Sequence, residues 1–236
     1  MVIDRRRFIL IAAAATAAPG HTRSIAQDAT PAAAPTSSLG WNDPLDATGM
    51  LNVATTVAPI SSIVRNIGGD RIQLRGIVPD GTNSHTFEPA PSDAKILGAA
   101  DLIFVNGLSL ELPTLELAEA NLKDGAEIVT LGDQTVTDDQ WVFDFSFPKE
   151  DGEPNPHLWT NIPYGKRYAE IVAENLSRRD PDHAGYYAEN LARYSAVLDN
   201  LDAAILAAVQ TIPEKNRKLL TYHDSWAYFA QHSGMT

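Results

Sequence analysis

Apolar and polar positions alternate regularly between residues 51 and 133 of the chain. Short apolar runs, typical of buried β-strands, are separated by segments whose apolar residues recur every three or four positions, as they do on helices. The expected strands are LNVATT (51–56), RIQLRGIV (71–78), DLIFVNG (101–107) and AEIVTLGD (126–133). The expected helices are PISSIVRNIGG (59–69), SDAKILGAA (92–100, begun by Ser92) and ELPTLELAEANLKDG (111–125). This β-α repetition predicts an α/β fold with a mostly parallel sheet.

A longer apolar stripe predicts a long amphipathic helix over residues 180–212. Asp180 and Pro181 supply an N-cap and a first-turn proline, and the stripe stops before Pro213. Spacings that alternate between four and three residues describe one face of a helix of about 30 residues, or about 45 Å. The stripe consists of Tyr187, Leu191, Tyr194, Leu198, Leu201, Ile205 and Ala208. A dimeric coiled coil is the alternative, which two tyrosines in the seam disfavour.

The amino terminus carries the pattern of an export signal, predicted to span residues 1–26. Three arginines, Arg5 to Arg7, precede an apolar run that is too short to cross a bilayer as a stable helix. They resemble a twin-arginine signal, with the general secretory route as the alternative. Residues 27–48, rich in Ala, Pro, Ser and Thr, are predicted to be a flexible linker. The mature protein is therefore expected to be soluble and periplasmic or otherwise extracytoplasmic.

Charge and cysteine content exclude several classes of function. The net charge is −12, from 18 basic and 30 acidic side chains, which disfavours binding to nucleic acid or anionic lipid. The chain has no cysteine, so disulfides, thiolate zinc sites and nucleophilic thiols are excluded. A metal ion would have to be held by His, Asp or Glu, and the chain has six histidines.

Three of these histidines occupy similar places, at the ends of expected strands or at loop exits. They are His85 in GTNSHTFEPAPSD, His157 in NPHLWTNIP and His223 in TYHDSWAYFAQHSG. His223 lies at the end of the expected short strand KLLTY (218–222), immediately before an expected aromatic-rich helix. Open α/β sheets gather ligand-binding groups at the carboxyl ends of their strands. Neutral imidazoles suit borderline divalent cations such as Zn²⁺. The pattern predicts a three-histidine metal site built from converging loops; a solvated or core-packed histidine is the alternative at each position.

Together, SHTFEPAPSD, NPHLW and TYHDSWAYF resemble the motifs of the ZnuA-like, cluster A-I metal-binding proteins of zinc and manganese ABC importers. Those motifs commonly read HxYEPxPSD, DPHxW and TxHDAFxYF. The resemblance spans roughly residues 50–236 and implies that His85, His157 and His223 are metal ligands. It departs from the family pattern at Asn83-Ser84, where Asp-Pro is common, and at Ser225-Trp226.

The resemblance also implies a function. Such a protein captures a divalent ion and delivers it to the membrane permease of an ABC importer, as a monomer and not as an enzyme. A histidine at the third ligand position, here His223, accompanies zinc in the family, whereas a glutamate there accompanies manganese. The expected ligand is therefore Zn²⁺, with Mn²⁺ less favoured. The fourth coordination position has no assigned residue.

The family resemblance gives the predicted domain organisation. It has an N-terminal α/β metal-binding lobe at 49–179, a connecting helix at 180–212, and the start of an incomplete second α/β lobe at 213–236. In the family the second lobe normally continues well past the third histidine motif, so the chain is expected to be a fragment or an unusually short member.

Four other polar residues are weaker candidates. Glu88 and Asp224 could reach the metal or orient an imidazole, with a turn-stabilising or solvated role as the alternative for each. His183 and His232 are flanked by polar residues and are not expected to be ligands. The acidic segment 132–155 is expected to be a solvated loop, with weak cation recruitment as the alternative.

Two other functional classes share some of these features. A zinc hydrolase also uses three histidines and an open position, but the chain has no HExxH motif and no carboxylate clearly placed as a general base. A metal-dependent adhesin or an exported interaction module would use the same lobe for protein contacts. A module that acts through those contacts alone would tolerate loss of the histidines. Metal capture for import is the favoured prediction.

Overall fold

The centre of the molecule is a sheet of four parallel strands in the order β2-β1-β3-β4. The computed structural model describes residues 49–236, so the predicted signal (1–26) and linker (27–48) lie outside the described residues. The strands are β1 Leu51–Thr55, β2 Ile72–Gly76, β3 Leu102–Val105 and β4 Glu127–Thr130. Each strand lies within a run predicted to be one, and the expected parallel sheet is confirmed.

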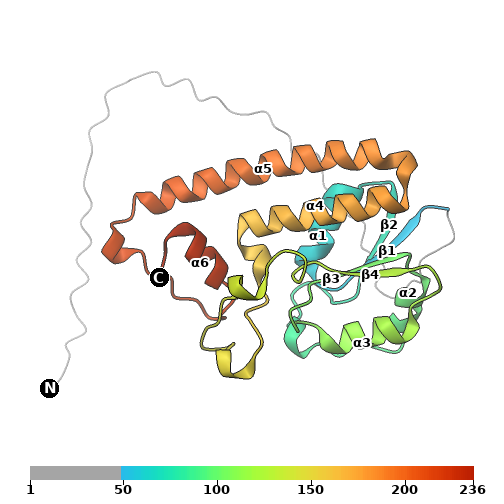
Figure 1. Ribbon diagram of the computed structural model, residues 1–236, viewed down its shortest axis with the longest axis horizontal. Coiled ribbons are helices and arrows are strands. Elements are labelled where there is room, and N and C mark those ends of the chain that lie inside the picture. The colour runs from blue at the N-terminus through green and yellow to red at the C-terminus, as the bar shows by residue number, and fades with distance from the viewer. Residues whose placement is uncertain (1–48) are drawn as a thin grey trace, which may run out of the picture. The chain divides into compact units, whose positions relative to one another are not determined.

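Helices cover both faces of this sheet (Figure 1). Helices α1 and α4 lie over one face with α5 packed outside them, and α2 and α3 lie over the other. The α-helices are α1 Ala58–Gly68, α2 Asp93–Ala99, α3 Leu112–Asn121, α4 Ile162–Arg179, α5 Ala184–Gln210 and α6 Ala227–Ser233. Short 3₁₀ turns are η1 Ser84–Thr86, η2 Asp138–Gln140, η3 Lys149–Asp151, η4 Leu158–Thr160, η5 Pro181–His183 and η6 Glu214–Asn216. Ser92 precedes α2 as predicted, although its side chain forms no capping hydrogen bond.

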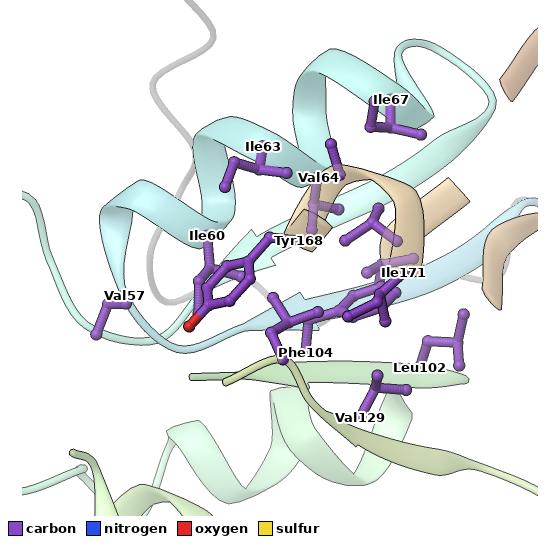
Figure 2. Packing of buried hydrophobic residues seen from close by; sticks show 14 of the residues in the cluster. Val57, Ile60, Ile63, Val64, Ile67, Leu102, Phe104, Val129, Tyr168 and Ile171 are labelled. Atoms are coloured by element: carbon purple, nitrogen blue, oxygen red, sulfur yellow. The ribbon is translucent and has the colours of Figure 1, made fainter. Parts of the chain in front are cut away.

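The core forms because successive strand residues point to opposite faces of the sheet. Val53 and Phe104 pack toward α1 and α4, whereas Ala54 and Ile103 pack toward α2 and α3. Figure 2 shows Phe104 among side chains of α1 and α4, including Tyr168. Because both faces are covered, the central strand β3 is a continuous apolar run, LIFV, whereas the edge strand β2, IQLRG, alternates buried and partly exposed residues.

Helix α4 has no counterpart among the elements predicted from the sequence. Its buried residues Tyr168, Ile171, Val172 and Leu176 follow the spacing of one helix face. A proline stands in its first turn, where the missing N–H costs no hydrogen bond. The helical signal is therefore present in residues 162–179, directly after the NPHLW motif.

Helix α5 confirms the long helix but not its predicted ends. It has 27 residues, because Pro181–His183 form the separate turn η5. The Asp180 carboxylate does not cap the backbone; it accepts a hydrogen bond from the Tyr187 hydroxyl at 2.6 Å. Tyr187 is fully buried against the core, whereas Leu201, further along the same stripe, is 47% exposed. No helix within residues 49–236 combines the length and apolar character needed to cross a membrane.

The predicted strand KLLTY, residues 218–222, is wrong. A strand needs a continuous ladder with a neighbour, and residues 218–222 are not in a strand. The hydrogen bonds from Leu219 N–H to Thr236 O and from Thr236 N–H to Arg217 O, both 2.8 Å, join this region to the last residue without forming a ladder. Leu220 and Tyr222 are almost completely exposed, so no sheet face packs against them.

A buried carboxyl group joins the carboxyl ends of β1 and β3. Glu111 Oε1 accepts hydrogen bonds from Thr56 Oγ1 and from the Asn106 backbone N–H, each at 2.6 Å. The Asn106 side chain donates to Pro156 O at 2.9 Å and accepts from the Tyr168 hydroxyl at 2.8 Å. This network connects the sheet edge to α4 and to the segment that carries His157.

Burial raises the pKa of Glu111 to about 7, against the opposing effect of its hydrogen bonds from Thr56 and Asn106. The folded chain therefore holds this proton more tightly than the unfolded chain, whose carboxyl has a pKa near 4.5. The resulting stabilisation is fully present below pH 4.5 and is lost as the pH rises through about 7.

We predict that Glu111→Gln removes this pH dependence. Between pH 4.5 and 8, the unfolding free energy of the wild type should fall relative to that of Glu111→Gln by on the order of 3 kcal/mol. Urea denaturation of the metal-free chain across this range measures the difference. Glu119→Gln, at an exposed position of α3, is the control and should give a profile parallel to that of the wild type. A parallel profile for Glu111→Gln would contradict the prediction.

Candidate metal centre

The three histidines predicted to converge lie close together in the structure. His85 is in η1 beyond β2, His157 immediately precedes η4, and His223 lies ahead of α6. The Nε2 atom of His157 is 3.2 Å from Nε2 of His85 and 3.1 Å from Nε2 of His223. One ring nitrogen from each residue falls within 4.8 Å of the other two. Three segments that are distant in the sequence therefore direct imidazole nitrogens at a common point.

The exposure of the three imidazoles is graded. His157 is buried with 4% of its surface accessible, His85 is half-buried, and His223 is exposed. A cleft of about 910 Å³ opens beside them, between α1, the second half of α5 and Trp226. All three imidazoles line this cleft, so the cluster is reached from it.

Burial and the neighbouring imidazoles favour the neutral forms of His157 and His85. Burial lowers the pKa of His157 to about 3, with a further contribution from the neighbouring His85 and His223. Burial, followed by the proximity of His223, also lowers the pKa of His85. Neutral imidazoles carry a lone pair on one ring nitrogen, which is the form that binds a metal ion.

Asn155 determines which nitrogen of His157 is available. Its Oδ1 atom lies 3.0 Å from the His157 backbone N and 2.8 Å from His157 Nδ1. Since the amide oxygen can only accept, Nδ1 carries the hydrogen and the lone pair remains on Nε2. The amide nitrogen of Asn155 donates to Asp144 Oδ2 and to the backbone oxygen of Asp224, each at 2.6 Å. Such partners fix the tautomer and orientation of a histidine ligand.

Asn155 was not among the predicted site residues. Its sequence signal is its place two residues before His157, where the motif of the resembling family commonly has aspartate. The role became visible only in the structure, because Asp144 and Asp224 are brought to it by folding.

The weaker candidates do not join the cluster. Glu88 is exposed and, within residues 49–236, is hydrogen-bonded to none of the three histidines. The Asp224 carboxylate accepts from Ser146 Oγ at 2.6 Å. His183 Nδ1 lies 2.8 Å from Asp180 Oδ2, and His232 Nε2 lies 2.8 Å from Asp202 Oδ1. The last contact links α6 to α5, so His232 has a structural partner.

The acidic segment 132–155 differs in part from the solvated loop that was predicted. Its residues Asp144 to Phe147 fold against the histidine cluster, and the Phe147 ring centroid lies 5.6 Å from that of His85 and 5.7 Å from that of His157. Phe145, two residues earlier, is 96% exposed. One turn of this segment therefore belongs to the site.

The fold and the histidine cluster define an α/β protein whose candidate ligand groups gather beyond the carboxyl ends of parallel strands. Residues 53–236 match the family model described as zinc-uptake complex component A, periplasmic. The chain belongs to this family, which consists of binding components of metal transporters and not of enzymes. The resemblance drawn from the three motifs is confirmed.

Curated relatives and solved structures agree with this assignment. The metal ABC transporter substrate-binding lipoprotein FimA of Streptococcus parasanguinis is 33% identical over 80% of this chain and 61% of its own length. The manganese ABC transporter substrate-binding lipoprotein PsaA of Streptococcus pneumoniae is 32% identical over 78% of this chain and 60% of its own length. The chain thus spans about 60% of the length of these relatives.

Two solved structures have the same fold over most of the chain. The periplasmic zinc-binding protein TroA from Treponema pallidum has a TM-score of 0.71 and 29% identity, over 79% of this chain and 65% of that one. The Mn-bound periplasmic metal-binding protein from Candidatus Liberibacter asiaticus has a TM-score of 0.70 and 28% identity, over 78% of this chain and 66% of that one.

We predict that Asn155→Ala weakens Zn²⁺ binding about ten- to a hundredfold, because His157 loses the partner that fixes its tautomer. Calorimetric titration measures the affinity. Asn175→Ala is the matched control, since Asn175 is also a buried asparagine but is bonded within α4 to Ile171 O. An Asn155→Ala affinity within twofold of the control would show that the amide does not orient the ligand.

Proposed function

We propose that this protein captures a divalent metal ion, Zn²⁺ in preference to Mn²⁺, outside the cytoplasmic membrane for delivery to an ABC importer permease. His85, His157 and His223 are the proposed ligands. The observation that carries the proposal is the approach of the three Nε2 atoms, at 3.1 and 3.2 Å from the central one. Family membership supports the transport role. Among the relatives, PsaA is named for manganese and TroA for zinc.

The chemistry of the ligand set supports zinc. Imidazole nitrogen is a good ligand for Zn²⁺, whereas carboxylate and water oxygens suit the harder Mn²⁺. Nitrogen sites also bind Zn²⁺ more tightly than Mn²⁺ in the general order of divalent affinities. Within residues 49–236, the cluster of possible ligand atoms contains three imidazoles and no carboxylate.

We predict that replacing His85, His157 or His223 singly by Ala weakens Zn²⁺ binding by at least about tenfold, or roughly 1.4 kcal/mol. His183→Ala and His232→Ala should leave the affinity nearly unchanged, because these side chains are bonded to Asp180 and Asp202 instead. Calorimetry ranks the five variants. Thermal denaturation of each metal-free variant separates lost ligation from lost folding, which matters most for the buried His157. Either control variant ranking with the first three would refute the ligand assignment.

A competition titration tests metal choice. The unmutated chain should bind Zn²⁺ more tightly than Mn²⁺, and His223→Glu should shift the preference toward Mn²⁺ by replacing a nitrogen donor with a carboxylate. His223→Gln is the control, because it removes the imidazole without adding a charge. Equal or tighter Mn²⁺ binding by the unmutated chain would overturn the zinc preference while leaving metal capture intact.

A further inference from the structure

Residues 144–147 form a compact turn, here called the clasp, within the acidic segment. Asp144 N–H donates to Phe147 O at 3.0 Å. In return, Asp144 Oδ1 accepts from the backbone N–H groups of Ser146 and Phe147, each at 3.1 Å. The clasp therefore holds its own shape, and the Phe147 ring is presented from a fixed backbone.

The clasp has a connection to each of the three histidine-bearing segments. Asp144 Oδ2 accepts from Asn155, the residue that holds His157. Ser146 Oγ donates to the Asp224 carboxylate, directly after His223. The Phe147 ring lies against His85 and His157 together. A single short turn thus contacts the surroundings of all three proposed ligands.

The Phe147 ring contacts the histidine cluster but does not line the cleft. His85, His157 and His223 all line the cleft, whereas Phe147 does not, although it touches two of the same imidazoles. An aromatic ring offers no ligand to a hydrated cation and leaves no room for its water shell. The side of the cluster that Phe147 covers is therefore closed to the ion, and the cleft remains its route.

We propose that Phe147 is a kinetic determinant of metal exchange, closing one side of the histidine cluster so that the ion passes only through the cleft. This inference rests on the proposed function. Removing the ring opens a second route, which an ion uses equally for binding and for release. The association and dissociation rate constants should therefore both rise while the equilibrium affinity changes little.

Stopped-flow measurements on the full chain with Zn²⁺ test this inference. The Trp159 ring centroid lies 5.2 Å from that of His157, so tryptophan fluorescence should report binding, and excess chelator gives the release rate. For Phe147→Ala we expect both rate constants to increase about tenfold and Kd to change less than threefold. Phe147→Leu, which keeps an apolar cover, should stay within about threefold of the wild type in each rate.

Phe145→Ala is the matched control, because this neighbouring phenylalanine is exposed and touches none of the histidines within the described chain. It should leave both rates unchanged. Rates for Phe147→Ala equal to those of Phe145→Ala would overturn the inference. So would faster release with unchanged association, since Phe147 would then stabilise the bound state and not limit passage. Failure of the unmutated chain to bind Zn²⁺ would instead refute the proposed function.

Discussion

The candidate metal centre depends on the contact between His157 Nδ1 and Asn155 Oδ1, at 2.8 Å. His157 is the central imidazole, within 3.2 Å of a nitrogen from each of the others, so its tautomer decides whether a lone pair faces the common point. The same amide donates to Asp144 and to the backbone of Asp224. The buried Asn155 side chain is thus hydrogen-bonded to the central imidazole, to the clasp and to the segment that carries His223, and it fixes their relative positions.

Residues at the end of strand β3 stabilise this arrangement through hydrogen bonds. Asn106 follows β3 and holds the carbonyl of Pro156, one residue before His157, while its own backbone is held by Glu111. A buried carboxyl is costly unless it is hydrogen-bonded or protonated, and Glu111 has bonded partners together with a pKa raised by burial. Hydrogen bonds from the end of β3 therefore fix the position of the loop that carries His157.

The nearby carboxylates of Asp144 and Asp224 are hydrogen-bonded to residues other than the three histidines. Asp144 is bonded to Asn155 and Asp224 to Ser146, so each acts on the surroundings of a histidine and not as a donor in the cluster. This explains how an acidic chain presents a nitrogen-only set of candidate ligands within the described residues. The Phe147 ring contacts the cluster, and the cleft opens beside the same histidines.

The sequence by itself determined the parallel sheet, the long helix and the identity of the three histidines that meet. Strand and helix periodicities are local consequences of burial, and strand ends in such sheets converge on one edge. The ends of α5 and the strand expected at 218–222 were not predictable, because Pro181–His183 form a separate turn and a strand exists only where a neighbour pairs with it. Only the tertiary structure decided the roles of Asn155, Glu111 and Phe147. Their partners are remote in sequence, and a hydrogen bond or ring contact between remote residues leaves no periodic trace along the chain.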